Sequence, residues 1–269
     1  FPKVYAAVFS AFYIPFMVFL VALIFRAISI EFRSKEPMQW WRRLWDWSYC
    51  LSSCLIALAL GLVLGNILQG LPLDANGNFQ GDWTSFLNPY AGMVAITTLA
   101  LFMMHGAIYL VMKTEKRLYT KLTILVKNST IFFVISMLLL SFYTLLYQAH
   151  LTERIKENTW MFMIPVLMVF AVANIARRIS QQRYRQAFLS SSVVISLLLV
   201  IVAVELYPNM VISTLDPAYS LTVANSASSE KSLGIMLVFA AIGVPLVAIY
   251  TGFVFWTFKG KVKLDEMSY

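Results

Sequence analysis

Long runs of apolar residues are the feature that most constrains this chain. A helix needs about 20 predominantly apolar residues to cross the hydrocarbon core of a bilayer. Seven stretches approach this length, at residues 4–25, 47–68, 90–112, 122–147, 159–175, 188–206 and 233–258. The sequence therefore predicts an all-α membrane protein, a bundle of about seven transmembrane helices that forms a single domain over residues 1–269.

The composition excludes most other classes of protein. Hydrophobic residues make up 60% of the chain and charged residues only 13%, against about 25% charged in a typical soluble domain. So few charges cannot cover so much apolar surface in water. Cys50 and Cys54 lie four residues apart within an apolar run, and we interpret them as buried thiols rather than as a disulfide or metal pair. The sequence contains no Walker loop, no H-E-x-x-H motif and no nucleophile elbow, so the chain alone does not look like a complete redox enzyme.

Lys and Arg are distributed unevenly between the connections. One set of alternate connections holds sixteen of them and the other set holds four. Because basic residues concentrate in cytoplasmic loops, we expect the amino terminus outside and the carboxyl terminus inside. The net charge of +8 is then an orientation signal at an anionic leaflet and does not indicate nucleic acid. The sixteen are Arg26, Arg33, Lys35, Arg42, Arg43, Lys113, Lys116, Arg117, Lys121, Arg177, Arg178, Arg183, Arg185, Lys259, Lys261 and Lys263, and the four are Lys3, Arg154, Lys156 and Lys231.

Two connections on the side with few basic residues have a polar composition. In residues 69–89, Pro72 and Asn76-Gly77 are turn signals, which indicate a short hairpin. Residues 207–232 are rich in Ser, Thr, Asn and Pro and too numerous for a simple connector. We expect this second connection to fold over the outer surface.

Ionisable side chains within predicted spans are candidates for function, and three occur here. His105 is interpreted as a hydrogen-bonded packing residue, with haem ligation or proton transfer as alternatives. Lys127 is close enough to the inner surface to extend its ammonium group there. Glu205 lies at the outer end of its span, one turn before Pro208, where it reaches outer water or faces a partner subunit or a quinone headgroup.

The densest group of charges begins where the first predicted span ends on the inner side. Arg26, Glu31 and Arg33 follow one another closely, with Lys35 two residues later. Their spacing would not place them in one row of a continuing helix, so we expect a helix end that leads into an irregular turn. The group is either a solvated cluster beside the membrane or an ion network that carries protons or docks a partner.

A series of short stretches along the whole chain points to one family. They are Val4–Ala7, Phe25–Arg26, Glu31–Lys35, Trp45–Trp47, Gly65–Pro72, Leu87–Tyr90, His105–Leu110, Lys113–Thr114, Tyr207–Pro208, Ser220–Thr222, Asn225–Ser229, Pro245 and Tyr250–Thr251. No single stretch is specific, but in this order they resemble subunit II of cytochrome bd-type quinol oxidases. That subunit has nine spans, and the first span of this chain is similar to its third. The resemblance therefore implies that the family's first two helices are missing from this sequence.

The resemblance also implies a role. Such oxidases, in the bacterial or archaeal cell membrane, oxidise ubiquinol or menaquinol and reduce oxygen to water with cytoplasmic protons. Their haem b and haem d groups are ligated by subunit I, so this chain is expected to ligate no cofactor and to be non-catalytic by itself. It would support assembly and the access of protons, or of oxygen, to the haems. Arg26, Glu31, Arg33 and Asp46 match family positions at the inner side, which implies proton entry or subunit contact there. Other expected partners are quinol, membrane lipid and small single-helix subunits. Whether a quinone binds to this subunit is left open.

Seven spans with an outer amino terminus are also the topology of a seven-helix receptor, and a secondary transporter is a further alternative. The third predicted span has no D-R-Y-like end, and Asn88-Pro89-Tyr90 lies at an outer end rather than an inner one. A retinal protein would need a lysine in residues 233–258, which have none. A transporter would carry charges at the midplane and broken helices, and only His105 comes near this pattern.

Overall fold

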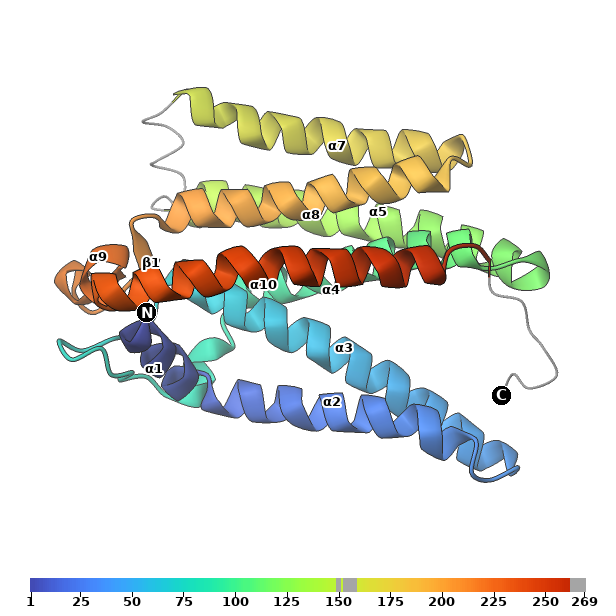
Figure 1. Cartoon of the computed structure of the whole chain (residues 1–269), viewed down its shortest axis with the longest axis horizontal. Coiled ribbons are helices and arrows are strands. Elements are labelled where there is room, and N and C mark those ends of the chain that lie inside the picture. The colour runs from blue at the N-terminus through green and yellow to red at the C-terminus, as the bar shows by residue number, and fades with distance from the viewer. Residues whose placement is uncertain (149–150, 152–158, 262–269) are drawn as a thin grey trace.

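Seven long apolar helices make up most of the structure, a computed structural model that describes residues 1–148, 151 and 159–261. Within these residues, seven helices are long and apolar enough to cross a membrane, and they lie roughly parallel to one long axis (Figure 1). They are α2 (Tyr13–Arg33), α3 (Gln39–Gln69), α4 (Pro89–Lys113), α5 (Lys116–Tyr147), α7 (Met163–Ser180), α8 (Tyr184–Leu206) and α10 (Glu230–Thr257). The predicted all-α membrane fold is confirmed. The orientation of its termini across the membrane stays a prediction.

The predicted first span differs from the structure. Residues 4–25 do not form one helix, because a separate helix, α1 (Pro2–Ala11), ends at Phe12 before α2 begins. The physical reason is Pro15. Its nitrogen has no proton to donate to the carbonyl of Ala11, and its ring would clash with that carbonyl in a continuous helix. The apolar run hides this break, since both sides of it are equally hydrophobic.

The first span is consequently shifted towards the charged segment. Helix α2 continues to Arg33, where its last turn is closed by the backbone N–H of Ser34 donating to the carbonyl of Glu31. The connection to α3 is therefore only residues 34–38, and not the predicted loop 26–46. Arg26 and Glu31 lie on a regular helix, so the expected irregular turn begins later than the sequence suggested.

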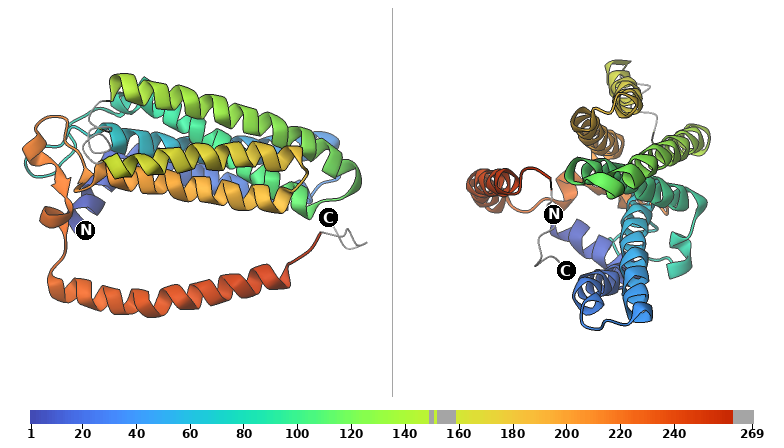
Figure 2. Two further views of the ribbon diagram at one scale, coloured as in Figure 1. Left: turned by 90° about the horizontal axis from the view of Figure 1, so that it is seen from above. Right: turned by 90° about the vertical axis from the view of Figure 1, so that its right-hand side faces the viewer.

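Four helices, α4, α5, α7 and α8, form one packed unit around the largest cluster of buried apolar residues. Met104 and Ile108 of α4, Phe133 of α5, Ile175 of α7 and Val194 of α8 are all fully buried in its core. Helix α3 packs along α4, and α2 packs along α3, so that these two extend from the unit as an arm, seen end-on in Figure 2.

The contact between α3 and α4 is unusually close, because small residues face each other. A Cβ atom on Gly61 would lie 2.6 Å from the Cα of Ala95, and one on Gly65 would lie 2.6 Å from the Cα of Ala91. Small residues four apart allow membrane helices to approach until their backbones touch. This pair of helices is therefore held together by backbone proximity rather than by large side chains.

The connections 70–88 and 207–229 meet at one end of the bundle, which we call the loop end. In the first, Leu73 pairs with Phe79 across a turn in which Gly77 has a φ of 81°. The turn predicted at Asn76-Gly77 is confirmed. Asp74 holds it by accepting hydrogen bonds from the backbone N–H groups of Asn76 and Asn78 at 2.9 and 2.8 Å. A short 3-10 helix, η1 (Trp83–Phe86), precedes α4.

The second connection packs on the first, as expected of a segment that folds over the ends of the spans. Its strands β1 (Asn209–Val211) and β2 (Leu221–Thr222) pair antiparallel, with Val211 opposite Leu221. Leu71 of the first connection bridges to Ser213. The remaining short elements are η2 (Thr159–Phe162), η3 (Pro217–Tyr219) and α9 (Val223–Ser226).

Helix α10 stands apart from the other spans in both views of Figure 2. None of its residues is buried. At its end, the Nζ of Lys113 donates to the carbonyl of Phe258 at 2.7 Å, and Lys261 lies 3.6 Å from a carboxylate oxygen of Glu115. Helix α10 is thus held at its carboxyl end, with an apolar surface along its length.

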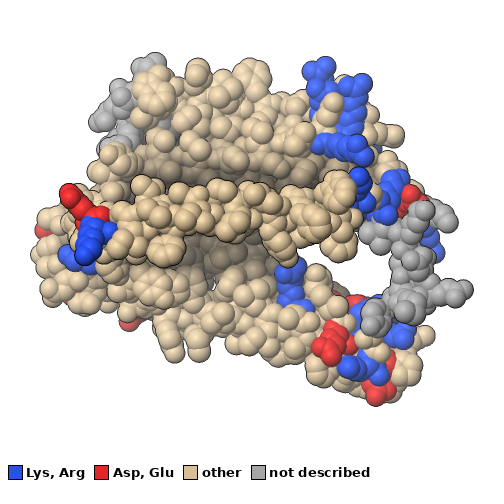
Figure 3. All heavy atoms as spheres, viewed as in Figure 1, with Lys and Arg blue, Asp and Glu red and all other residues tan. Residues whose placement is uncertain are grey.

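Basic side chains gather at the end opposite to the loop end, which we call the basic end (Figure 3). It consists of the turns at residues 34–38, 114–115 and 181–183 and the carboxyl end of α10. Arg154, Lys156 and Lys263 of the sequence count lie outside the described residues. The cysteines are free, as expected, but Cys50 is exposed and Cys54 only half-buried, so their interpretation as buried thiols is wrong.

Candidate functional site

The charged residues predicted at the basic end form separate pairs rather than one network. Nε of Arg33 lies 2.6 Å from Oδ1 of Asp46, and Nη2 lies 3.5 Å from Oδ2. Glu31 pairs instead with Lys35, four residues later in the turn that follows α2, at 3.5 Å. Each of the two carboxylates therefore has its own basic partner, and the Arg33–Asp46 pair joins the end of α2 to the start of α3.

Arg26 lies two turns before this pair and contacts a different residue. Its guanidinium carbon is 5.4 Å from the ring centre of Tyr49, and its Nη2 donates to the Tyr49 hydroxyl at 3.4 Å. Between the two contacts, the buried Ser29 hydroxyl donates to the hydroxyl of Ser48 at 2.9 Å. Sequence reasoning missed Tyr49 and Ser48, since only the antiparallel register of α2 and α3 brings them opposite Arg26 and Ser29.

The ion pairs at the basic end are solvated. The side chains of Arg33 and Asp46 are 48% and 53% exposed, and those of Lys35 and Glu31 are 60% and 72% exposed. Exposed pairs of this kind contribute about 0–1 kcal/mol of stability each. Their main effect is geometric, because they fix how α2 and α3 meet and present an ordered set of charges at the membrane surface.

His105 is half-buried on α4, where it faces α8, and it is the start of a row of polar side chains. Its Nδ1 is 2.8 Å from the hydroxyl oxygen of the fully buried Ser191, and its ring stacks on Phe188 with centres 4.7 Å apart. On the next residue of α8, the Ser190 hydroxyl accepts from the amide of Asn174 at 2.8 Å. The Nε of Arg178 donates to Asn174 at 3.2 Å.

This polar row starts at the basic end and consists of two hydrogen-bonded groups, Arg178–Asn174–Ser190 and Ser191–His105, which meet at neighbouring residues of α8. Arg178 is near the carboxyl end of α7, Asn174 one turn deeper, and His105 deeper still on α4. The sequence did not reveal it, because serines are common in membrane helices and only packing shows which of them face a histidine.

Glu205 occupies the loop-end part of α8 and is half-buried. Its carboxylate is within electrostatic reach of the buried hydroxyl of Tyr90, which is hydrogen-bonded to Thr144. The apolar neighbours in this region include Leu68 and Leu206. Glu205 and His105 therefore belong to different parts of the bundle and do not form one site.

A pocket of about 240 Å³ with both polar and apolar lining residues lies at the loop end, where two of the stretches quoted for the family resemblance meet. The amide of Asn66 donates to the carbonyls of Leu62 and Phe86 at 2.8 and 3.0 Å, and its oxygen accepts from Asn88 at 2.8 Å. Asn88 in turn caps α4 by accepting from the backbone N–H of Ala91 at 2.8 Å. These bonds fix the entry into α4 against the end of α3.

The class defined by this fold is a multi-pass membrane protein whose polar groups lie mainly at helix ends and in one interior row. More specifically, residues 1–258 match the family model described as cytochrome bd terminal oxidase subunit II, and the chain belongs to this family. The resemblance found in the sequence is thereby confirmed, as is the assignment to a terminal oxidase in the cell membrane. The receptor and transporter alternatives receive no support.

Individual relatives agree with this membership. The chain is 28% identical over 267 residues to cytochrome bd ubiquinol oxidase subunit 2 of Bacillus subtilis, covering 99% of this chain and 78% of that protein. It is 24% identical over 296 residues to cytochrome bd-I ubiquinol oxidase subunit 2 of Escherichia coli K12, with the same two coverages. The solved structure of bd oxidase from Geobacillus thermodenitrificans has a TM-score of 0.74 at 15% identity, over 96% of this chain and 77% of that chain. This last match shows the shared fold.

Proposed function

We propose that this chain is the supporting subunit of a quinol-oxidising, oxygen-reducing terminal oxidase and that it pairs with a haem-bearing subunit I. The names of the Bacillus subtilis and Escherichia coli relatives, both ubiquinol oxidase subunits, support this reaction class. In such a complex, haem b and haem d supply electron transfer and oxygen binding. Quinol, membrane lipid and small single-helix subunits are further proposed partners.

The observation that carries this division of labour is the set of metal-binding side chains in this chain, which does not fit a haem. The ring of His105 is stacked on Phe188 and its Nδ1 is bonded to Ser191, which leaves only Nε2 as a possible ligand atom. Haem takes one or two axial side chains, and among the residues that the structure describes His105 is the only histidine, so no second imidazole is available on the opposite face of a haem. Haem ligation is therefore assigned to the partner.

A difference spectrum tests this assignment. The purified two-subunit complex carrying His105→Gln is expected to keep the haem b and haem d bands of the wild type at an unchanged subunit ratio. Loss of one haem band with both subunits present would contradict it. Haem bound by this chain purified without its partner would contradict it equally.

For Arg26, Glu31, Arg33 and Asp46 we propose a role in subunit contact in preference to proton entry. Both carboxylates already have basic partners. In addition, only Ala22 and Ser29 of α2 are buried, so that α2 offers a long apolar face that ends in these charges. A helical partner can use such a face for packing and the charges for alignment. Proton access is better supported at the polar row from Arg178 to His105, because it leads inward.

Two readouts separate these roles. Arg26→Ala or Glu31→Gln is expected to reduce the amount of subunit I that remains bound through purification, while oxygen consumption per haem stays near the wild-type value. Lys231→Ala, an exposed basic residue at the loop end, is the control. If assembly is complete and oxygen consumption per haem falls, the group serves proton entry instead. Wild-type behaviour in both measurements would refute either role.

Glu205 is proposed to face a partner subunit or a quinol headgroup at the loop end. Its half-buried carboxylate lies beside Tyr90, which makes it a hydrogen-bond acceptor in an otherwise apolar region. Glu205→Gln is expected to raise the KM for quinol if a headgroup binds there, and to weaken subunit association if a partner does. A variant with normal KM and normal assembly would contradict the proposal.

A further inference from the structure

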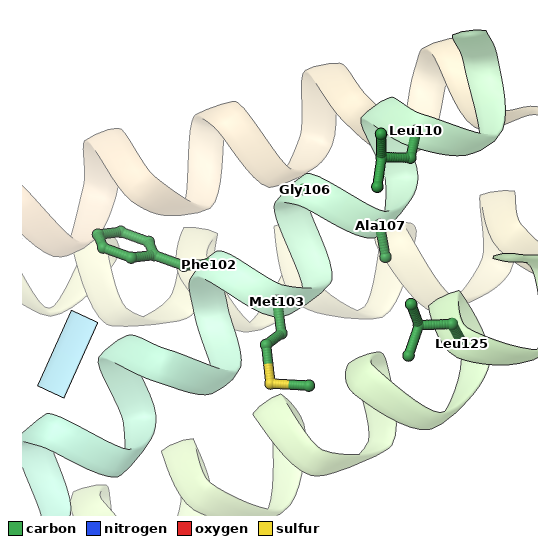
Figure 4. A pocket seen from close by; sticks show the side chains of 6 residues that line it. All are labelled: Phe102, Met103, Gly106, Ala107, Leu110 and Leu125. Atoms are coloured by element: carbon green, nitrogen blue, oxygen red, sulfur yellow. The ribbon is translucent and has the colours of Figure 1, made fainter. Parts of the chain in front are cut away.

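An apolar groove runs between α4 and α5 in the half of the bundle nearer the basic end (Figure 4). Its volume is about 230 Å³ and its surface is almost entirely apolar. The residues that line it are Phe102, Met103, Gly106, Ala107, Leu110 and Leu125. Of these, Phe102, Met103 and Leu110 are 41–46% exposed, so the groove opens outward from the packed unit.

The groove exists because one position on α4 has no side chain. A Cβ atom on Gly106 would meet no heavy atom within 4 Å. The larger side chains of Met103 and Leu110 stand on either side of this gap. No described residue fills it, and in a bilayer an apolar hollow is filled by whatever hydrocarbon lies next to it.

The shape of the groove selects a chain rather than a helix. Its lining on α4 extends from Phe102 to Leu110, about 12 Å at 1.5 Å per residue. With a volume of about 230 Å³ over that length, the groove is narrow and open to the outside. A helix, with a diameter of about 10–12 Å, is too wide to enter.

Basic side chains lie beyond the basic end of the groove. Lys121 is one turn from Leu125 on the same face of α5, about 6 Å closer to that end. Arg117 is one turn further. Both side chains are exposed, and neither has an ion-pair partner among the residues the structure describes. Lysine and arginine at this depth extend to the headgroup layer.

We propose that the groove and these two basic residues together bind one anionic phospholipid, with an acyl chain along Gly106 and the phosphate at Lys121 and Arg117. Basic pockets between membrane helices are known sites for acidic headgroups. A neutral lipid or an isoprenoid chain would fill the groove equally well but would gain nothing from the unpaired cations. The inference deepens the proposed partnership with membrane lipid and does not depend on the oxidase reaction.

Lipid retention on the intact complex tests the proposal. The complex is reconstituted in nanodiscs of equal phosphatidylglycerol and phosphatidylcholine, extracted into detergent, and examined by native mass spectrometry. The wild type is expected to retain phosphatidylglycerol in preference. Lys121→Gln is expected to reduce this preference about fivefold, the effect of about one lysine at a membrane surface. Gly106→Leu, whose Cβ meets no heavy atom within 4 Å, fills the groove and is expected to abolish retention.

Matched controls use the same substitutions elsewhere. Gly92→Leu also lies on α4 in open space, and Lys231→Gln removes a charge at the loop end, so both are expected to retain lipid as the wild type does. If Gly106→Leu does not assemble, Leu125→Phe narrows the groove from α5 and takes its place.

Two outcomes would overturn the proposal. If Gly106→Leu abolishes retention and Lys121→Gln does not, the occupant is an uncharged chain. If neither variant changes phosphatidylglycerol retention, the lipid is only the general surrounding layer. Haem content and oxygen consumption are measured on the same samples. If only the lipid proposal is wrong, haem content and oxygen consumption are normal while lipid retention does not follow the prediction. If only the oxidase role is wrong, haem content or oxygen consumption is abnormal while lipid retention follows the prediction.

Discussion

Replacing either glycine at the α3–α4 contact should destabilise the bundle. In Gly61→Ala and Gly65→Ala, the new Cβ would lie 2.6 Å from a Cα atom of α4, where ordinary contacts begin at 3.4 Å. The opposing atoms belong to the backbone, so no side-chain rotation relieves the contact. The helices must separate by about 0.8 Å at that point.

The expected magnitude follows from two opposing effects. Overpacking a tight contact typically costs about 1–3 kcal/mol. Removing a glycine from a helix interior returns up to about 1 kcal/mol. Each single variant should therefore lose about 1–2 kcal/mol of unfolding free energy. The double variant should lose less than the sum, because the first separation of the helices already relieves the second contact.

Unfolding of the purified complex in mild detergent, followed by heat or by denaturant, measures this loss. Gly92→Ala is the control, since its Cβ meets nothing within 4 Å, and it should be neutral or slightly stabilising. Adding Ala91→Gly to Gly65→Ala should restore little, because the nearest atom of Ala91 is its Cα. If Gly61→Ala and Gly65→Ala are as stable as Gly92→Ala, the close approach of the helices is not what holds them together.

Three further predictions concern polar residues. The backbone N–H of Asn78 holds the pKa of Asp74 below its usual value near 3.8. The ionised carboxylate should therefore stabilise the turn above pH 3.8, and this stabilisation should be lost as pH falls through the lowered pKa. Hydrogen exchange at residues 74–80 should show the turn opening in acid in the wild type and not in Asp74→Asn. Asn88→Ala removes the cap of α4 and should cost about 0.5–2 kcal/mol in thermal unfolding, and an unchanged midpoint would exclude a capping role. A double-mutant cycle of Arg33→Gln and Asp46→Asn in the complex should give a coupling above about 1 kcal/mol, the upper limit for an exposed pair, because the proposed subunit contact covers it, and a smaller value would show that the pair stays solvated.

The number and position of most spans could be predicted from apolar runs alone, because a bilayer demands length and hydrophobicity of each helix. The break at Phe12 could not, since the residues on both sides are apolar and only Pro15 indicates it. The turn at Asn76-Gly77 could be predicted, because glycine tolerates the positive φ that such a turn requires and Gly77 adopts it.

The candidate site was less predictable. Arg33 and Asp46 were each recognised, but their pairing depends on the register between two helices, which no local pattern encodes. His105 was recognised because an ionisable side chain within a span is conspicuous in the sequence. Ser191 was not recognised, because only the folded structure shows that its hydroxyl faces the histidine. Gly106 had no sequence signal at all, since a glycine in a membrane helix equally indicates close packing, as at Gly65, or an open groove.

The isolation of α10 has a mechanical consequence. A helix of 28 residues is a rod of about 42 Å. If it pivots at the loop end, a rotation of only 10° displaces its other end by about 7 Å. The contacts of Lys113 with Phe258 and of Lys261 with Glu115 act at that far end, where leverage is greatest. Two surface interactions at that end therefore influence the angle of an entire span, and salt that screens the pair of Lys261 and Glu115 would be felt along its full length.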